Sequence, residues 1–402
     1  MSWPIVQLKE IASVKGGKRL PKGEKYSEVP TPYPYLRVCD FKNRTIDSRN
    51  LEFIKIETHE KISRYVISKD DVYISIAGTI GLVGCIPDSL DGANLTENAA
   101  KIVINKTNLL DRDYLILFLA TVGQSAIFSK KMATSQPKLA LFRIEELEIP
   151  LPPLPEQKRI AAILDKADQL RQKRRQAINL ADEFLRSVFL EMFGDPVTNP
   201  KGWEVRKLSD FYVDAKNGTK CGPFGSALKK HEYLDSGIPV WNMDNITLNG
   251  KFIDDPHLWI TKEKFNALKA YNVFPGDIII SRAGTVGKMG VVCSKYPESI
   301  ISTNLIRVRF GNELVPEYFV SLMIFCKGRV GNLKTGPDGS FTHMNTGILD
   351  KLDFPSPPLS AQQQYVSVYN RINIFKKKLQ STIDEADYFF NSLSQKAFAG
   401  QL

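Results

Sequence analysis

The chain has 402 residues, 43% of them hydrophobic and 10% aromatic, so it can bury more than one ordinary core. It has no apolar run of about 18 residues and no signal-peptide pattern, which favours a soluble, cytoplasmic protein over a membrane-spanning or secreted one. Five cysteines without a C-x-x-C pair and four scattered histidines favour neither a disulfide framework nor a zinc site. The formal charge of +10 makes nucleic acid the first partner to consider.

Landmark residues of the sequence occur twice in the same order, with the second copy about 205 residues after the first. The paired landmarks include Trp3 and Trp203, Leu8 and Leu208, Ala77 and Ala283, Gly78 and Gly284, Asn98 and Asn304, Gln157 and Gln362, and Ser187 and Ser392. One unit was duplicated and then diverged. A molecule with two related halves suits a target that also has two related halves.

The first copy, residues 1–153, carries 21 basic and 18 acidic residues and opens with a strand-like stretch and a glycine-rich loop. Alternating or β-branched runs predict further strands over residues 34–38, 72–77 and 101–104. The stretch from Asp113 to Ser129 predicts a helix with Asp113 in its first turn. We expect an α+β domain with a twisted, mainly antiparallel sheet.

A proline-rich strand exit at residues 149–155 leads into a predicted long helix over residues 154–195. A stripe with alternating spacings of four and three predicts a coiled-coil seam on this helix. Its members are Ile160, Leu164, Ala167, Arg171, Arg174, Ile178, Ala181, Leu185 and Val188. Residues 156–193 would span roughly 57 Å if fully helical.

The second copy spans residues 196–358 and repeats the same order of elements. Residues 196–359 carry 20 basic and 16 acidic residues. Strands are predicted over residues 238–241, 277–281 and 305–309, and a helix over 316–326. A second long helix, over residues 359–402, keeps the phase of the first stripe, with Lys376 in the place of Arg171. We expect the two long helices to pair as an antiparallel coiled coil that separates the domains. The alternative is that each helix packs only on its own domain.

Several dispersed motifs, in order and partly in duplicate, resemble Type I restriction-modification specificity subunits. They are Pro150-Leu151-Pro152-Pro153-Leu154-Pro155-Glu156-Gln157, Met192-Phe193-Gly194-Asp195-Pro196, Asn199-Pro200-Lys201-Gly202-Trp203, Gly222-Pro223-Phe224-Gly225-Ser226, Gly237-Ile238-Pro239-Val240, Ser281-Arg282-Ala283-Gly284-Thr285-Val286-Gly287 and its earlier copy Ser75-Ile76-Ala77-Gly78-Thr79-Ile80-Gly81. The resemblance covers essentially the whole chain.

The resemblance implies that each copy is a target recognition domain that reads one half of a bipartite site on double-stranded DNA. It also implies that the helices set the spacer and carry two methyltransferase (modification) subunits, which act on an adenine in each half-site. S-adenosylmethionine would belong to those subunits, so this chain is expected to need no cofactor or metal of its own. A restriction subunit would be an optional further partner, for cleavage.

Base reading requires donors and acceptors that reach groove edges, whereas phosphate contacts position the protein. In the first copy the candidates are Lys15, Lys18, Arg19, Lys22, Arg37, Asp40, Thr79, Gln136 and Lys138. In the second copy they are Lys216, Asn217, Thr219, Lys220, Asn242, Asp244, Arg282, Thr285, Thr342, His343 and Asn345. Arg282 can pair bidentately with guanine and Ile76 at the matching place cannot, so the halves should prefer different sequences. Solvated turns and ordinary loop polarity are the alternative explanation for each candidate.

Three other functions compete with this interpretation. A self-contained methyltransferase or nuclease is disfavoured, because the chain lacks an Asn/Asp-Pro-Pro-Tyr/Phe motif and a nucleophile constellation. Glu156-Gln157-Lys158 matches a nuclease fragment but opens a predicted helix, where an acid suits the helix dipole. The others are the specificity subunit of a Type II-like system with a fused methyltransferase-nuclease partner, and a scaffold that binds only proteins. We expect a non-catalytic specificity subunit.

Overall fold

The computed structural model describes residues 3–129, 138–224, 227–325 and 344–402. The chain divides into two compact units. Unit 1 comprises Met1–Gln176 and Leu379–Leu402, and unit 2 comprises Ala177–Lys378. Each unit therefore holds one copy of the repeat together with parts of both long helices. In the described ranges, no helix is both long and apolar enough to cross a membrane.

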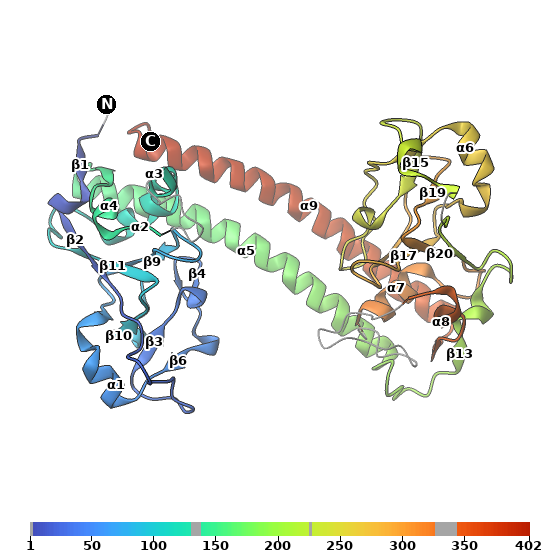
Figure 1. Cartoon of the computed structure of the whole chain (residues 1–402), viewed down its shortest axis with the longest axis horizontal. Coiled ribbons are helices and arrows are strands. Elements are labelled where there is room, and N and C mark those ends of the chain that lie inside the picture. Colours follow the sequence, from blue (N-terminus) through green and yellow to red (C-terminus); the bar gives the residue numbers. More distant parts are fainter. Residues whose placement is uncertain (1–2, 130–137, 225–226, 326–343) are drawn as a thin grey trace. The chain divides into compact units, whose positions relative to one another are not determined.

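Unit 1 is built on a mainly antiparallel set of strands (Figure 1). One sheet has the order β2-β11-β8-β9, formed by Ala12–Gly16, Ala99–Ile104, Val72–Ser75 and Val83–Gly84. The other has the order β6-β3-β10-β7, formed by Glu52–Phe53, Pro34–Leu36, Ala93–Leu95 and Val66–Ile67. Two smaller pairs join β1 (Ile5–Gln7) to β12 (Glu148–Pro150) and β4 (Phe41–Lys42) to β5 (Thr45–Ile46). Among these pairings only β3 and β10 run parallel.

Unit 2 repeats this arrangement. Its larger sheet has the order β14-β20-β17-β18, formed by Thr219–Cys221, Leu305–Val308, Ile278–Ser281 and Met289–Val291. Its smaller sheet has the order β16-β15-β19, formed by Trp259–Ile260, Ile238–Trp241 and Ile300–Ile301, with β15 and β19 parallel. A further pair joins β13 (Val205–Lys207) to β21 (Asp353–Pro355). The predicted α+β class with mainly antiparallel sheets is confirmed.

The central strands are buried on both faces, which explains their continuous apolar sequences. In β8, Val72 and Ile74 join the core under the helices, while Tyr73 joins a second core with Phe41. In β17, Ile278 and Ile280 likewise enter one core and Ile279 another. Because successive side chains point to opposite faces of a strand, each strand serves two cores at once.

Short helices lie against the sheets of each unit. In unit 1 these are α1 (Ile56–Lys61), α2 (Arg112–Ala120), α3 (Gly123–Ser129) and α4 (Leu141–Glu145); in unit 2 they are α6 (Lys262–Ala267), α7 (Pro316–Phe325) and α8 (Thr346–Asp350). Figure 1 shows α2, α3 and α4 on the side of the β2-β11-β8-β9 sheet that faces α5.

The single helix predicted from Asp113 to Ser129 is wrong, because the chain forms α2 and α3 with a break at Thr121. The helix N-cap is Asp111, whose carboxylate accepts hydrogen bonds from the backbone amides of Asp113 and Tyr114. The break brings Gly123 so close to the preceding turn that a Cβ there would lie 2.9 Å from the Phe118 carbonyl oxygen.

Both long helices have 40 residues: α5 is Leu154–Phe193 and α9 is Leu359–Phe398. Each ends before a glycine with positive φ, Gly194 at 76° and Gly400 at 74°. Every residue of the predicted stripe is buried or half-buried in both helices. Side chains of the stripe therefore form the seam.

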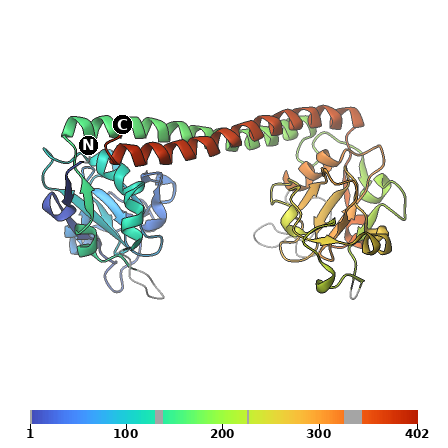
Figure 2. The same cartoon turned by 90° about the horizontal axis from the view of Figure 1, so that it is seen from above.

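The helices run antiparallel in each unit. In unit 1, the last turns of α9 lie beside the first turns of α5 (Figure 2), and Phe398 packs against Tyr114 and Phe118 of α2. In unit 2, Phe189 near the end of α5 packs edge-on against Tyr365 near the start of α9. The expected antiparallel coiled coil is confirmed, and the alternative in which each helix packs only on its own domain is wrong.

Candidate nucleic-acid interface

Both units fix their glycine loop by the same close approach. After β2, the amide of Gly17 donates to the Ala99 carbonyl, and a Cβ at this position would lie 2.0 Å from the Thr96 carbonyl oxygen. After β14, the amide of Gly222 donates to the Leu305 carbonyl, and a Cβ would lie 1.9 Å from the Ser302 carbonyl oxygen. Only glycine fits either place, so the two loops are structural counterparts.

These contacts place a different side chain two residues further on in each unit. In unit 1 it is Arg19, whose Nε donates to Glu97 Oε1 at 2.7 Å. Burial disfavours the ionised form of Glu97, but hydrogen bonds from Arg19 and other donors outweigh it, so the pKa of Glu97 lies below its usual range. In unit 2 the counterpart of Arg19 is Phe224, which is exposed.

Arg37 and Asp40 lie at the corner after β3, where they bond to each other. The Arg37 guanidinium donates to both carboxylate oxygens of Asp40, to Glu52 Oε1 at 2.8 Å and to the Asn50 carbonyl oxygen at 2.8 Å. The hydrogen bond with Asp40 is the main cause that raises the pKa of Arg37. Asp40 itself is buried. Both side chains hold the corner together, and their role at DNA stays a prediction.

Arg19 and Arg37 nevertheless line one cavity of about 380 Å³ on unit 1. The sequence did not single out six further polar residues that line the same cavity: Tyr26, Tyr35, Cys39, Thr96, Glu97 and Asn98. Of these residues, Asn98 could have been found from the sequence, because it recurs as Asn304 in the repeat. We call this rim, formed by Arg19, Arg37, Glu97 and Asn98, the glycine-loop edge of unit 1.

The glycine-loop edge of unit 2 consists of the counterparts Phe224, Asn242, Thr303 and Asn304, together with Arg282. Asn242 Oδ1 accepts a hydrogen bond from Ser302 Oγ at 3.1 Å. The backbone amide of Asn242 donates to Asn245 Oδ1 at 3.0 Å, as the backbone amide of Arg37 donates to Asp40. The Arg282 guanidinium lies over the Phe224 ring, with its central carbon 4.5 Å from the ring centroid. The structure thus brings the predicted residues Asn242 and Arg282 to one edge, and the neighbouring Asp244 side chain is exposed.

The two Gly-Thr segments form tight turns beside these edges. Gly78 has φ of 73° and Gly284 has φ of 66°, values that favour glycine. In each turn a buried serine hydroxyl, Ser75 or Ser281, donates to the carbonyl oxygen of the threonine at 2.5 Å. The predicted residues Thr79 and Thr285 are exposed.

A second loop of unit 2, residues 214–217, is stabilised by hydrogen bonds to Asp214 and from Arg307. The Asp214 carboxylate accepts from the amides of Lys216 and Asn217 and from the Asn217 side chain at 2.9 Å. The buried guanidinium of Arg307 donates to the Asn217 carbonyl oxygen at 2.9 Å. Burial lowers the pKa of Arg307 to about 10. Sequence reasoning missed Arg307, which stabilises the shape of this loop.

The other predicted residues have varied surroundings. Lys15, Lys18, Lys22 and Lys216 are exposed, Thr219 Oγ1 is 3.5 Å from Asp350 Oδ1, and the Lys220 ammonium is 5.6 Å from the Tyr271 ring centroid. Lys138 forms a β-bridge with Ala77 and is exposed. Asn345 caps α8, because its Oδ1 accepts from the Ile348 amide at 2.9 Å. Gln136, Thr342 and His343 lie outside the described residues.

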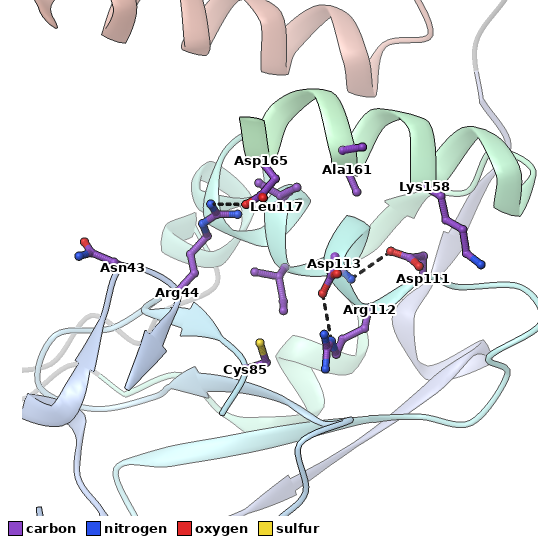
Figure 3. A pocket seen from close by; sticks show the side chains of 12 residues that line it. Asn43, Arg44, Cys85, Asp111, Arg112, Asp113, Leu117, Lys158, Ala161 and Asp165 are labelled. Carbon is purple, nitrogen blue, oxygen red and sulfur yellow. Dashed lines mark hydrogen bonds and ion pairs between the residues drawn. The ribbon is translucent and has the colours of Figure 1, made fainter. Parts of the chain in front are cut away.

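A cavity of about 570 Å³ in unit 1 lies away from the predicted residues, between the β4–β5 turn, the start of α2 and α5 (Figure 3). Its lining includes Arg44, which donates to Asp165 at 3.1 Å and to the buried Asp168 at 2.7 Å. Burial raises the pKa of the Cys85 thiol, which also lines the cavity. Across the described ranges, no three histidine, cysteine, aspartate or glutamate side chains are grouped so that they could hold a metal ion.

Comparisons with known proteins agree with this architecture. The family model for the Type I restriction modification DNA specificity domain matches residues 2–180 and 200–385. Among curated proteins of Methanocaldococcus jannaschii, the chain is 23% identical to the Type I restriction enzyme MjaVIII specificity subunit and 25% identical to the putative type I restriction enzyme MjaX specificity subunit. Both alignments cover 96% of this chain and 90% of the relative.

Two solved structures have the same fold. The crystal structure of the Type-I restriction-modification system S subunit from M. genitalium matches with a TM-score of 0.56 at 16% identity, over 99% of this chain and 96% of that one. A chain from work on complex assembly and conformational transition of the type I R-M system matches with a TM-score of 0.58 at 17% identity, over 100% and 98%. Because the family model matches both copies of the repeat, this chain belongs to the Type I restriction modification DNA specificity domain family.

Proposed function

We propose that this chain is the DNA-specificity subunit of a Type I restriction-modification complex, in which each unit reads one half of a split target on double-stranded DNA. The observation that supports it most is the repeated glycine-loop edge. Its backbone contacts recur in both units, while the side chains on it differ: Arg19 and Arg37 in one unit, Phe224 and Asn242 in the other. A fixed frame with variable polar groups is what two readers of different half-sites need.

Charge supports a nucleic-acid target for both units. Residues 1–153 and 196–359 each carry an excess of basic residues. Lysines around the first glycine loop are exposed and free to approach phosphate, and release of counterions would add affinity without sequence preference. Arginine and asparagine on the edges would then supply the contacts to bases.

Apolar residues on the helices support two copies of one partner. Leu170 and Phe389 in unit 1 and their counterparts Phe375 and Phe184 in unit 2 are exposed. The four residues are related by the repeat offset, so each unit presents the same kind of apolar pair from α5 and α9. Exposed apolar residues that recur in this way suit a protein interface. We assign it to two modification subunits that bind S-adenosylmethionine and methylate adenine, with a restriction subunit as an optional partner.

The experiment is to exchange residues 203–353 for the same segment of a relative and to map adenine methylation across a genome. One half of the methylated motif should change and the other should stay. The matched control exchanges the first-copy segment, which should change only the other half. If either exchange alters both halves, the two units are not independent readers and the proposal fails.

The long helices can be tested as the spacer ruler. Arg174 in α5 donates to the Thr382 carbonyl oxygen in α9, so residues 174–177 and 379–382 lie on facing turns. Deleting both segments removes about 6 Å from each helix at 1.5 Å per residue. The spacer between the methylated half-sites should shorten while both half-sites persist. An unchanged spacer would contradict the role of the helices as ruler.

A further inference from the structure

We propose that Phe224 is a positioning residue for Arg282: its ring supports the guanidinium so that the N–H groups meet a guanine in the half-site read by unit 2. The proposal rests on the proposed function, because it names a specificity determinant of that same edge. The predicted set of DNA-binding residues did not include Phe224.

The first observation is that Phe224 is an exposed aromatic side chain on a fixed backbone. Its side chain is 56% exposed, although it follows Gly222, whose backbone cannot move away from Ser302 without losing the contact described above. An apolar ring held at the surface stabilises its own unit little by burial. Its position is better explained by what it supports.

The second observation is the direction of the contact. The central carbon of Arg282 lies over the ring, 4.5 Å from its centroid, within the range of a cation–π interaction. Stacking of this kind uses the flat face of the guanidinium and leaves the N–H groups at its edge for hydrogen bonds. Bidentate recognition of guanine needs those same edge groups, held in one plane.

The third observation comes from the two other stacked arginines of unit 2. The central carbon of Arg206 lies 4.2 Å from the centroid of Phe211, but Arg206 also donates to Glu313 Oε2 at 2.8 Å. Arg309 lies 4.3 Å from the centroid of Phe274, but it also donates to both carboxylate oxygens of Asp277 at 2.7 Å. Within the described residues, Arg282 has no such carboxylate partner. Of the three stacked arginines, the one at the glycine-loop edge is the one without a carboxylate partner among the described residues, so its N–H groups are available to a base.

In unit 1 the arginine at the glycine-loop edge and the group that holds it are different residues. Ile76 replaces Arg282 and Arg19 replaces Phe224, so the guanidinium comes from the glycine loop and is held by Glu97 instead of by a ring. Loss of the aromatic ring should therefore affect the half-site of unit 2 only.

The experiment uses the full chain assembled with its modification subunits, and duplexes that carry the motif found by methylation mapping. Variants are Phe224→Ala, Phe224→Leu, Phe224→Trp, Arg282→Ala and the double variant Phe224→Ala with Arg282→Ala. Phe274→Ala is the matched control, since it removes an exposed ring under the arginine that already has a carboxylate partner. Dissociation constants are measured for the cognate duplex and for duplexes with each G·C pair of the motif replaced in turn.

We expect Phe224→Ala to weaken cognate binding about 3- to 10-fold, as the loss of a cation–π contact implies, and to reduce discrimination at one G·C pair of the unit 2 half-site. Phe224→Trp should restore both, Phe224→Leu should not, and Phe274→Ala should change neither. In the Arg282→Ala background, Phe224→Ala should have no further effect.

The contrary results are distinct. Equal losses from Phe224→Ala in the presence and absence of Arg282 would show that the ring acts on DNA or on the fold directly, and would overturn the positioning role. Full recovery by Phe224→Leu would do the same, because leucine has bulk without a π-face. Failure of the unaltered complex to bind a split motif at all would instead reject the proposed function.

Discussion

Units 1 and 2 share a backbone frame but differ in how polar groups are used on it. The glycine contacts, the parallel strand pair (β3 with β10, β15 with β19) and the turn held by a serine hydroxyl recur in both units. The edge side chains do not: an ion pair between Arg19 and Glu97 stands where the other unit has Arg282 over Phe224. Duplication has preserved the contacts that only one residue type can make and altered those that several types can make.

The helix seams differ in the same way. The cation at the matching seam position pairs with an aspartate of the opposite helix in each unit, Arg171 with Asp387 at 3.4 Å and Lys376 with Asp182. In unit 1 a second acid, Asp168, lies between Arg171 and Arg44 of the β4–β5 turn, whereas its counterpart in unit 2 is Asn373. Charge therefore links domain and helix more extensively in unit 1.

The largest expected effect tests the shared part of the frame. Phe193 and Phe398 are repeat counterparts that pack against Tyr318 and Tyr114. Because both rings are buried, Phe193→Ala and Phe398→Ala should each cost about 3 to 5 kcal/mol. Hydrogen exchange resolved along the chain should show the loss in unit 2 for the first variant and in unit 1 for the second. A loss spread evenly over both units would mean that they do not unfold separately.

Substitutions of Arg37 and its counterpart Asn242 should distinguish a role in folding stability from a role in DNA recognition. Arg37→Ala leaves the buried Asp40 without its main partner and should reduce the free energy of unfolding by about 2 to 3 kcal/mol. Its counterpart Asn242→Ala should cost less stability and should instead weaken recognition of the unit 2 half-site. Thermal melts and methylation mapping of both variants check this pair. If Arg37→Ala melts normally but changes the motif, Arg37 reads DNA directly.

The ionic link of unit 1 gives a third comparison. Asp168→Asn removes the charge between Arg44 and Arg171 and should cost about 1 to 2 kcal/mol, since the amide keeps one acceptor. The reverse change in the other unit, Asn373→Asp, adds a carboxylate beside Lys376 and should leave stability the same or slightly higher. Chemical denaturation of both variants measures the difference. Equal losses would argue that residue shape, and not charge, matters at this position.

The smallest expected effect is a pH dependence of unit 1. Burial opposes ionisation of Asp168, but Arg44 and Arg171 outweigh it and set the pKa of Asp168 below its usual value. A lowered pKa in the folded state contributes stability above the unfolded-state pKa of about 3.9, and that contribution is lost as the pH falls through the folded-state value. Acid titration should destabilise unit 1 more steeply in the unaltered chain than in Asp168→Asn. Parallel curves would contradict the assignment.

Much of the architecture is readable from local patterns. The repeat, the two long helices and their stripe follow from spacing along the chain, because a helix presents every third or fourth residue to the same neighbour. The central strands are readable as apolar runs for a related reason, since both of their faces are buried. The edge segments could be located as well, through Gly17, Gly222 and the Gly-Thr turns.

Only the tertiary structure decides what the polar side chains on those segments do. Arg37 and Asp40 bond to each other, Asn345 caps a helix, and Phe224 lies under Arg282, although the sequence indicates only a strand end or a loop at each of these places. The break at Thr121 and the packing of Phe398 beside Tyr114 also depend on distant segments. Periodicity is a property of neighbours along the chain, whereas the partner of a polar or aromatic group is set by which remote residue folding brings within a few ångströms.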